Sequence, residues 1–490
     1  MKMYKRFLAG LMAISLAAPL TAVNASAIAP PRPKGNINYD GVFNLADTVM
    51  FRQWLHGKGS INDTSNADMN GDKSLDIYDF IAMRQNLLRG ISEANKRYEN
   101  SGTVNLCGGI ESALTDGKTL DEKFKDAQMG FSLELFKRTI KEDQNVLISP
   151  YSVSMALGMT ANGADSKTKE DMEKALGGLE ISELNKYLKT WRTGQPNKDN
   201  LKIHTANSIW IRNNEELIRP QPTFIQDTVN YYGADIFKAA FDQSTVNDIN
   251  DWINEHTDGM IPEILKELKP TDMMALINAV TFDAKWSTPY DDYQVKPHKF
   301  TAYDGSVKET DMLYGMESSY IQDEDAVGMM KYYEGGRYAF AAILPDEDIT
   351  VTDFVNNLTA ERLHKMFTEQ HCADVETILP KFKYESSSDL NDPLKDMGME
   401  SAFLGTADFS KMVTPDSIPL YISSVKHKTF IDLNESGTTA AAATIVLMAG
   451  NGVLQERELK EVILDRPFVY AIVDTETDLP LFMGTVMDIE

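Results

Sequence analysis

A run of small side chains near the C-terminus constrains what this chain can fold into more than any other feature. From Asn434 to Leu454 the residues are NESGTTAAAATIVLMAGNGVL, in which four alanines are flanked by threonines. Alanine favours a helix, but the glycine and the threonines weaken that preference, and no charged i,i+4 pair supports it. In an extended chain the same residues would present small side chains on both faces of a strand. The run is therefore either a piece of helix or a strand narrow enough to enter between two paired strands.

A resemblance favours the strand. Residues 435–444, ESGTTAAAAT, resemble the proximal hinge of inhibitory serpins, the part of an exposed loop that inserts into the central sheet once a protease has cut the loop. The resemblance implies a hinge formed by Glu435, Gly437, Thr438, Thr439, Ala440, Ala441, Ala442, Ala443 and Thr444.

The reactive bond is expected from counting along the loop as in that family, which implies Asn451–Gly452. Met448–Ala449 and Leu454–Gln455 remain alternatives. No lysine or arginine lies between Glu435 and Glu456, so a trypsin-like protease would have to cut at the next residue, Arg457. The loop therefore favours a subtilisin-like or elastase-like serine protease, and a cysteine protease stays open.

Longer motifs extend the serpin resemblance over a domain of residues 121–490. NVLISPYSVSMAL, LINAVTF, DAKW, ILPKFKY and SVKHKTF match segments that the family places in and under its central sheet. The resemblance implies that the following residues hold that sheet closed or anchor the hinge: Ser149, Ser152, Asn278, Trp286, Lys381 and His427. Lys381 is expected to pair with Glu435. Without the resemblance, His427 is simply a core histidine and Ser149 a helix cap.

The apolar pattern of this domain predicts helices mostly first and strands later, which indicates the α+β class. A helix is expected around 124–136, followed by a short strand that turns into a second helix at Ser149 and Pro150. Strands are expected at 203–211, 274–286, 338–344 and 376–383, with a hairpin at 466–487. The resemblance implies a serpin fold, with large mixed sheets, an exposed reactive loop and a monomeric domain.

An internal duplication lies within residues 36–90. Asn36–Asp47 aligns with Asp68–Asp79 at an offset of 32 residues, and Arg52-Gln53 recurs as Arg84-Gln85. Each copy has oxygen-bearing side chains at positions 1, 3, 5, 9 and 12 and a backbone carbonyl at position 7, the spacing of a twelve-residue Ca²⁺ loop. The expected ligands of two Ca²⁺ ions are Asn36, Asn38, Asp40, Val42, Asn44 and Asp47, and Asp68, Asn70, Asp72, Ser74, Asp76 and Asp79.

The two loops differ in charge and in turn geometry. The second has four carboxylates and is expected to bind Ca²⁺ more tightly than the first, which has asparagine at three ligand positions. Lys73 stands at position 6, where such loops carry glycine. A solvated polar loop is the alternative for each copy, but two copies in register favour calcium.

Two calcium loops, each followed by a helix, resemble the dockerin module of cellulosomal proteins, a small all-α unit that docks onto a cohesin domain of a scaffolding protein. The resemblance implies cohesin contacts at Leu45, Ala46, Arg52, Gln53, Ile77, Tyr78, Arg84, Gln85 and Arg89. Packing in the core of the module is the alternative for Leu45 and Ile77.

The remaining segments are interpreted as targeting and linking sequence. Residues 1–27 have a basic start, an apolar centre and an Ala25-Ser26-Ala27 cleavage pattern, as in a secretory signal peptide. A membrane anchor is the alternative, but Pro19 and Asn24 break the apolar span. Residues 28–35 are a proline-rich spacer, and residues 91–120 are expected to be a linker that lets two domains move independently.

Charge and motifs narrow the function. A net charge of −25 argues against nucleic acid and anionic membranes as partners. The chain has neither Gly-x-Ser-x-Gly nor His-Glu-x-x-His, and its two cysteines do not make a disulfide scaffold. We expect a secreted protease inhibitor, not an enzyme, tethered to a cellulosome that degrades polysaccharides. The alternatives are a non-inhibitory serpin-fold binding protein and a dockerin-borne carbohydrate-active enzyme with paired carboxylates.

Overall fold

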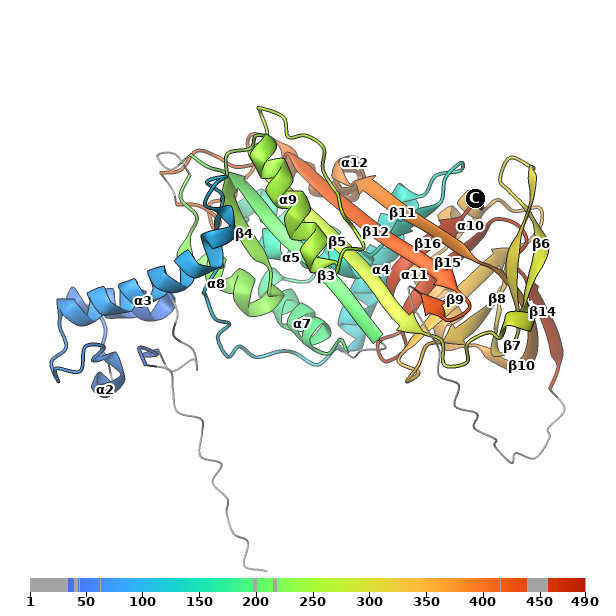
Figure 1. Cartoon of the computed structure of the whole chain (residues 1–490), viewed down its shortest axis with the longest axis horizontal. Helices are drawn as coiled ribbons and strands as arrows, with labels where there is room; N and C mark the ends of the chain where they lie inside the picture. The colour runs from blue at the N-terminus through green and yellow to red at the C-terminus, as the bar shows by residue number, and fades with distance from the viewer. Residues whose placement is uncertain are drawn as a thin grey trace, which may run out of the picture.

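The computed structural model describes residues 34–38, 43, 45–61, 63–196, 201–214, 218–414, 416–438 and 457–489. They form a small helical module and a large domain of two sheets and surrounding helices (Figure 1). The expected signal peptide, most of the spacer, the hinge residues from Thr439 to Thr444 and the bond Asn451–Gly452 lie outside the described residues.

The central sheet of the large domain has the strand order β1-β4-β3-β5-β13-β12-β11. The strands are β1 (Val104–Asn105), β4 (Asp235–Ala239), β3 (Leu201–Arg212), β5 (Met274–Lys285), β13 (Gly437–Thr438), β12 (Ser424–Asn434) and β11 (Phe382–Asp389). β5 pairs antiparallel with β3 and parallel with β12. Along β12, fully buried and half-buried residues alternate, because a strand turns successive side chains to opposite faces.

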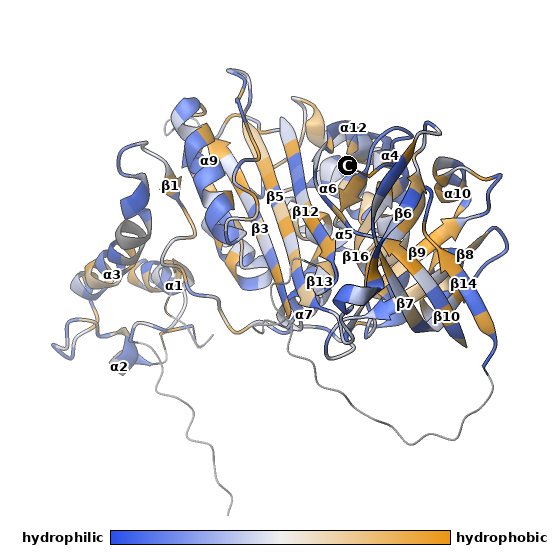
Figure 2. Cartoon of the chain, turned by 45° about the vertical axis from the view of Figure 1, so that its right-hand side comes forward, coloured by the Kyte–Doolittle hydropathy of each residue, from blue (hydrophilic) through white to orange (hydrophobic). Residues whose placement is uncertain are grey.

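The second sheet has the order β14-β10-β7-β8-β9-β15-β16-β2, with β6 paired to β7. Its strands are β14 (Leu459–Ile463), β10 (His371–Pro380), β7 (Val307–Gln322), β8 (Ala326–Tyr332), β9 (Tyr338–Pro345), β15 (Phe468–Asp474), β16 (Leu479–Val486), β2 (Val146–Ile148) and β6 (Val295–Thr301). β9, β15 and β16 are buried at every residue, and β9 is largely apolar (Figure 2). These strands form the middle of the core.

Helices cover both sheets. They are α4 (Glu122–Thr139), α5 (Pro150–Ala161), α6 (Ser166–Ala175), α7 (Ile181–Thr193), α8 (Pro222–Asp227), α9 (Gln243–His256), α10 (Val351–Asn357), α11 (Ala360–Thr368) and α12 (Asn391–Leu394). Shorter helical turns occur at η1 (Lys96–Tyr98), η2 (Thr228–Tyr232), η3 (Asp292–Gln294), η4 (Lys395–Met399) and η5 (Glu400–Phe403). No helix in the described part of the chain is long and apolar enough to span a membrane.

Two helices determine the surroundings of the central sheet. α5 is buried at every residue and contacts β16 of one sheet and β3 and β5 of the other. α9 lies across the opposite face of the central sheet (Figure 1). Its Ile249, Trp252 and Ile253 belong to a second core cluster with Ile277 of β5. Both faces of β5 are therefore covered by protein.

The N-terminal module contains α1 (Leu45–Leu55), α2 (Thr64–Ala67) and α3 (Ile77–Asn95). Its core is a separate small cluster of buried residues: Ile37, Phe51, Ile61, Ala67 and Met83. α1 and α3 contact each other and carry the two copies of the duplicated sequence. A core of this size provides little hydrophobic stabilisation by itself.

The segment expected to be a free linker is attached to the large domain. α3 continues to Asn95, and β1 pairs antiparallel with β4 at the edge of the central sheet. Tyr98 is 3% exposed and packs with its ring centroid 5.5 Å from that of Phe237. Tyr98 and β1, within the segment predicted to be a linker, therefore pack against the central sheet. The sequence did not indicate this packing, because a serine- and glycine-rich composition does not show where the few apolar side chains of a segment will bind. That residues 91–120 connect two domains stays a prediction.

Candidate functional site

The hinge begins as a strand that is already inside the central sheet. β12 and β13 form a hairpin with Glu435 and Ser436 in its turn, in which Leu433 faces Thr438 and Asn434 faces Gly437. β13 also pairs antiparallel with β5. Beyond Thr438, β5 and β12 pair directly with each other from Ser424 to Phe430. We call the line between β5 and β12 the seam. At its hinge end β13 lies between the two strands, and at its other end the two strands pair directly with each other.

Glycine is required at the entry to the seam. Gly437 has φ +155°, and a Cβ there would lie 2.1 Å from the carbonyl oxygen of Ala284 on β5. Any other side chain would push the hairpin away from β5. Thr438, the next residue, is fully buried, and its hydroxyl shares a hydrogen bond of 2.7 Å with the hydroxyl of Tyr333. The two residues are therefore fixed between the strands.

Three successive carbonyls of the hairpin turn accept hydrogen bonds from one segment. The indole N–H of Trp286 donates to the Asn434 carbonyl at 2.9 Å, and its backbone N–H donates to Ser436 at 3.0 Å. The backbone N–H of Tyr290 donates to the Glu435 carbonyl at 2.9 Å. These bonds clamp the turn from the β5 side.

Lys381 and Glu435 form an ion pair with a separation of 2.8 Å. The hydrogen bond from Lys381 holds the pKa of the Glu435 carboxyl below its usual range. Both side chains are about one third exposed, at 32% and 37%, so water screens the attraction and its contribution is about 0.5 kcal/mol. The pair is a minor part of the clamp.

The closed end of the seam rests on a buried network of polar side chains, which we call the shutter network. The backbone N–H of Ser149 donates to Nε2 of His427 at 2.9 Å, and Nδ1 of His427 contacts Oδ1 of Asn278. The Asn278 amide donates to the carbonyl and the hydroxyl of Ser152, at 2.9 and 2.6 Å. The network therefore ties β5 and β12 to the start of α5.

The protonation of His427 follows from its surroundings. Burial lowers the pKa of His427 to about 3, so the imidazole is neutral at neutral pH. A neutral ring that accepts at Nε2 must carry its proton at Nδ1, where it donates to Asn278. Ser149 also caps α5, since its hydroxyl accepts the backbone N–H of Ser152 at 3.2 Å. The cap and the network therefore use the same residue.

Three residues that the sequence analysis did not single out belong to these sites. Asn207 of β3 accepts a hydrogen bond from the Asn278 amide. Tyr333 stacks on Trp286 with ring centroids 4.4 Å apart, and Tyr290 holds the hinge turn. A polar residue within a predicted buried strand was the available signal for Asn207. Tyr333 and Tyr290 lie in loops next to strand ends and gave no such signal.

The second copy of the duplicated loop, residues 68–79, is described in full, and side-chain carboxylates bind its backbone N–H groups. The Asp79 carboxylate accepts the N–H groups of Met69 at 2.8 Å and Asn70 at 3.2 Å, and Asp68 accepts those of Gly71 and Lys73. Lys73 has φ +70°, the left-handed conformation that glycine usually supplies at position 6. The lysine is therefore accommodated in the turn.

The first loop repeats part of this pattern. The Asp47 carboxylate accepts the N–H groups of Ile37 at 2.7 Å and Asn38 at 3.0 Å, as Asp79 does in the second copy. Asp40, Val42 and Asn44 lie outside the described residues. Over the described ranges no three acidic, histidine or cysteine side chains group closely enough to hold a metal ion.

Seven of the nine residues expected to contact a cohesin have described side chains. Those with described side chains are all exposed: Arg52, Gln53, Ile77, Tyr78, Arg84, Gln85 and Arg89. Ile77 is 49% exposed and Tyr78 65%, so Ile77 does not belong to the core of the module. Leu45 and Ala46 begin α1.

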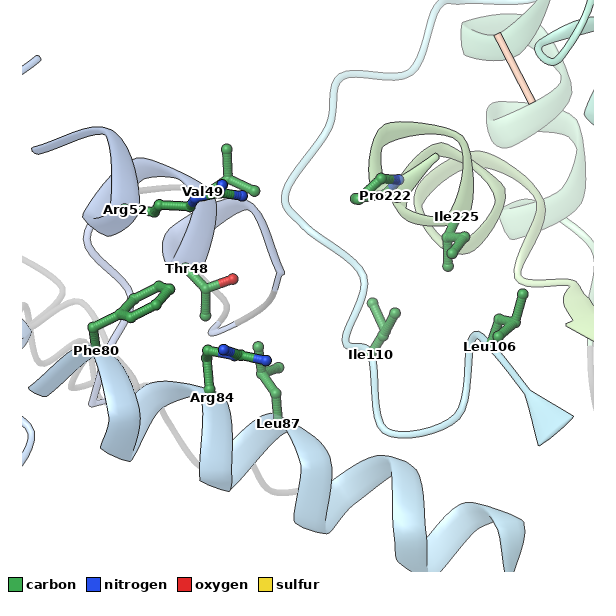
Figure 3. A pocket seen from close by; sticks show the side chains of 10 residues that line it. All are labelled: Thr48, Val49, Arg52, Phe80, Arg84, Leu87, Leu106, Ile110, Pro222 and Ile225. Atoms are coloured by element: carbon green, nitrogen blue, oxygen red, sulfur yellow. The ribbon is translucent and has the colours of Figure 1, made fainter. Parts of the chain in front are cut away.

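A groove of about 690 Å³ lies between the module and the large domain (Figure 3). Arg52 of α1 and Arg84 of α3 line it on one side, and Ile110, Pro222 and Ile225 on the other. Part of the surface expected to bind a cohesin therefore faces the large domain.

Sequence comparison relates this chain to one family of known proteins. The family model described as serpin (serine protease inhibitor) matches residues 126–489. This chain belongs to the serpin family. An uncharacterised serpin-like protein of Thermococcus kodakarensis is 32% identical over 365 residues, covering 73% of this chain and 84% of the relative. Neuroserpin of Mus musculus is 27% identical over 402 residues, covering 78% and 94%.

Solved structures with a similar fold also include serpins. Tengpin, a thermophilic serpin, matches in its native state with a TM-score of 0.75 and 44% identity, covering 79% of this chain and 100% of that one. Tengpin in its latent state matches with a TM-score of 0.67. Human thyroxine-binding globulin, solved with its ligand, matches with a TM-score of 0.67 at 23% identity over 75% and 99% of the two chains. The family is that of serine protease inhibitors, but the fold alone does not decide between inhibition and ligand binding.

Proposed function

We propose that this serpin inhibits a subtilisin-like or elastase-like serine protease by trapping it as a covalent acyl complex. The observation that carries the proposal is the position of Gly437 and Thr438, which already lie between β5 and β12. A loop that starts inside the sheet can continue inward without a separate opening step at the hinge end. The small side chains of residues 439–444 suit that path.

The chemistry is supplied by the target. The protease serine attacks the carbonyl of Asn451, the bond to Gly452 breaks, and the new amine leaves while the chain stays joined to the serine as an ester. Residues upstream of Asn451 are then free to enter the seam. Insertion carries the acylated protease along and distorts it before water can hydrolyse the ester. The energy comes from a native state that is kinetically trapped with its sheet incomplete.

The register of β13 predicts the register of the inserted strand. Thr438 faces Leu433 on β12 and Ala284 on β5, and His427 faces Asn278 across the closed seam. Continuing both ladders places Thr444 between His427 and Asn278, the two residues of the shutter network. The two ladders agree on this residue, which supports insertion of one continuous strand.

The same register indicates how far insertion runs. β5 begins at Met274, which would face Met448, and β12 begins at Ser424, which would face Leu447. An inserted strand from Gly437 to about Met448 leaves Asn451 just beyond the far edge of the sheet. This position favours Asn451–Gly452 over the later bond Leu454–Gln455, and Met448–Ala449 would put the ester at the last paired residue.

We further propose that residues 36–90 are a dockerin that binds two Ca²⁺ ions and attaches the inhibitor to a cohesin of a cellulosome scaffold, after secretion directed by residues 1–27. Support comes from the matching carboxylate contacts of Asp47 and Asp79 and from the exposed Ile77 and Tyr78. If bound, Ca²⁺ would be held by the carboxylates and carbonyls of these loops and would supply the order that the small core does not.

Inhibition is tested by mixing the protein with a subtilisin and with an elastase. A complex that survives a denaturing gel, and a cut mapped by mass to Asn451–Gly452, are expected. Cleavage of the loop by both proteases without any covalent complex would contradict the proposal and leave a binding protein of serpin fold.

The module is tested separately with a chelator. Removal of Ca²⁺ should unfold residues 36–90 and leave the trapping of the subtilisin unchanged, because the seam contains no part of the loops. Replacement of Asp68 and Asp79 with alanine should have the same effect. A module whose circular dichroism is the same with and without chelator would contradict the calcium assignment.

A further inference from the structure

A buried lysine lies beneath the clamp that holds the hinge. Lys331 on β8 is 3% exposed, and its ammonium nitrogen is 2.7 Å from a carboxylate oxygen of Glu317 on the adjacent strand β7. Burial of a lysine is costly unless it is paired, and an apolar side chain of similar size often packs as well. The two residues before it, Met329 and Met330, are buried methionines. Packing alone therefore does not account for a charge at this position.

The ammonium faces two aromatic rings that carry the clamp. It lies 4.2 Å from the ring centroid of Tyr290 and 5.5 Å from that of Trp286. A cation is attracted to the face of such rings, and the attraction is stronger where water is excluded. Tyr290 and Trp286 are the residues whose backbone N–H groups hold the Glu435 and Ser436 carbonyls.

The segment between these rings has little regular pairing of its own. β5 ends at Lys285, and Trp286 makes only an isolated bridge to Tyr333. Ser287 donates its N–H to the Tyr332 carbonyl at 3.0 Å. Apart from these few backbone bonds, residues 286–290 are held by contacts of their side chains, and the ammonium of Lys331 is a contact that both rings share.

We propose that Lys331, fixed by Glu317, is a positioning residue for loop insertion. Its charge holds Trp286 and Tyr290 in place, and they hold the hairpin turn from which the inserted strand must grow. This role rests on the proposed inhibitory function. During insertion the turn remains the fixed end of a lengthening hairpin while the strands on either side separate, so a loose turn delays each added pair of residues.

The consequence is a change in the fate of the acyl enzyme. Insertion competes with hydrolysis of the ester, and slower insertion releases more active protease together with cleaved inhibitor. In the proposed mechanism acylation takes place at Asn451, and Lys331 has no part in it. Loss of the Lys331 ammonium should therefore change the ratio of products and leave the rate of loop cleavage unchanged.

The test variant combines Lys331→Met with Glu317→Gln, so that no unpaired charge stays buried. Its matched control combines Arg362→Met with Asp323→Asn, which removes a half-buried ion pair just beyond the end of β7, at side chains that are 16% and 10% exposed. The other acidic partners of Arg362, Glu324 and Asp325, are 76% and 39% exposed, so the control also leaves no unpaired charge buried. Each protein is reacted with a subtilisin. The ratio of cleaved inhibitor to covalent complex on a denaturing gel is expected to rise about tenfold in the test variant, and to stay at the parent value in the control.

Hydrogen exchange provides a readout that does not depend on the protease. The backbone amides of Trp286 and Tyr290 should exchange faster in the test variant than in the parent, with no change in the control. If the double variant does not fold, Tyr290→Leu removes one ring beneath the ammonium, keeps the backbone N–H and should raise the same ratio.

The outcomes separate the two hypotheses. A parent protein that forms no covalent complex overturns the proposed inhibition. A parent that forms one, together with a test variant whose ratio and amide exchange are unchanged, overturns only the role of Lys331. A control variant that shifts the ratio as much as the test variant also overturns that role, because the effect would then reflect general loss of stability.

Discussion

The two ends of the seam between β5 and β12 are held by different chemistry. At the hinge end, aromatic rings, an ion pair and a clamped turn keep the strands apart around Gly437 and Thr438. At the other end, the neutral imidazole of His427 and the Asn278 amide keep the strands together. Under the proposed insertion, the hinge end would be the part of the seam that is extended, and the shutter end would be the part that has to open. The proposed function therefore asks different things of the two ends, and the following experiments test each of them.

Cutting the loop should have the largest effect on stability of the changes considered. The inserted strand would then lie between β5 and β12 along the whole seam, and the two ends of the seam would no longer differ. Filling the seam adds ladder hydrogen bonds worth ~1 kcal/mol each over roughly ten residues. Burial of residues such as Val446 and Met448 adds about 2 kcal/mol per side chain, and ordering of the loop offsets part of the total.

We expect the large domain cut near Asn451 to melt on the order of 10 °C or more above the intact domain. The measurement is a thermal melt before and after limited cleavage, with both fragments retained and the cut mapped by mass. An equal or lower melting temperature would show that the seam stays empty.

Blocking the hinge end should convert the inhibitor into a substrate. Thr438→Arg puts a charge where the structure has a fully buried hydroxyl, and an unpaired buried charge opposes entry of the strand. The loop should still be cut, but the yield of covalent complex per cut should fall about 100-fold.

Leu459→Arg is the matched control, because Leu459 follows the loop and is 58% exposed. Its yield of complex should equal that of the parent. Undiminished trapping by Thr438→Arg would rule out insertion through the hinge end.

Acid should weaken the shutter end. Because the pKa of His427 is lowered from 6.5 to about 3, the folded state prefers the neutral ring and the unfolded state binds the proton. The stability that this residue contributes is fully present above about pH 6.5 and is lost as the pH falls towards 3, by up to about 1.4 kcal/mol per unit.

The measurement is the free energy of unfolding of the parent and of His427→Gln from pH 7 to pH 4. The difference in free energy of unfolding between the two proteins should shrink as the pH falls. Taking this difference cancels the contribution of the other titrating groups, which both proteins share. A constant difference would mean that His427 does not sense protons in this range.

The exposed ion pair at the hinge end should have the smallest effect. Lys381→Met together with Glu435→Gln should change the free energy of unfolding by about 0.5 kcal/mol at low ionic strength. At 1 M salt the Debye length is about 3 Å, so salt should screen the attraction between these two partly exposed charges and the difference should disappear. A large effect that persists in salt would give the pair a greater part in the clamp than its exposure allows.

The sequence allowed much of the fold to be predicted. The strands expected at 203–211, 274–286 and 338–344 lie within or nearly coincide with β3, β5 and β9, and the hairpin at 466–487 contains β15 and β16. Alternation and continuous apolar runs are local signals, so they survive in a single sequence. The α+β class and the serpin family followed from these elements and from the quoted motifs, and the family match confirms them.

The site was predicted in part. The motifs led to Ser149, Asn278 and His427, which the fold brings into one network, but not to Asn207 from a third strand. The sequence also showed no sign that Tyr98, in the predicted linker, packs beside Phe237, because that contact joins residues far apart in the chain. Contacts between distant segments leave no mark on local composition.

By itself the sequence determined that the hinge is small enough to become a strand, because side-chain size and strand alternation are properties of the residues in order. Only the tertiary structure decided that this strand has already begun, with Gly437 and Thr438 paired on both sides. It also decided that Lys331 lies beneath Trp286 and Tyr290. Both facts depend on where β5, β8 and β12 meet. That is set by packing of the whole domain and not by any one segment.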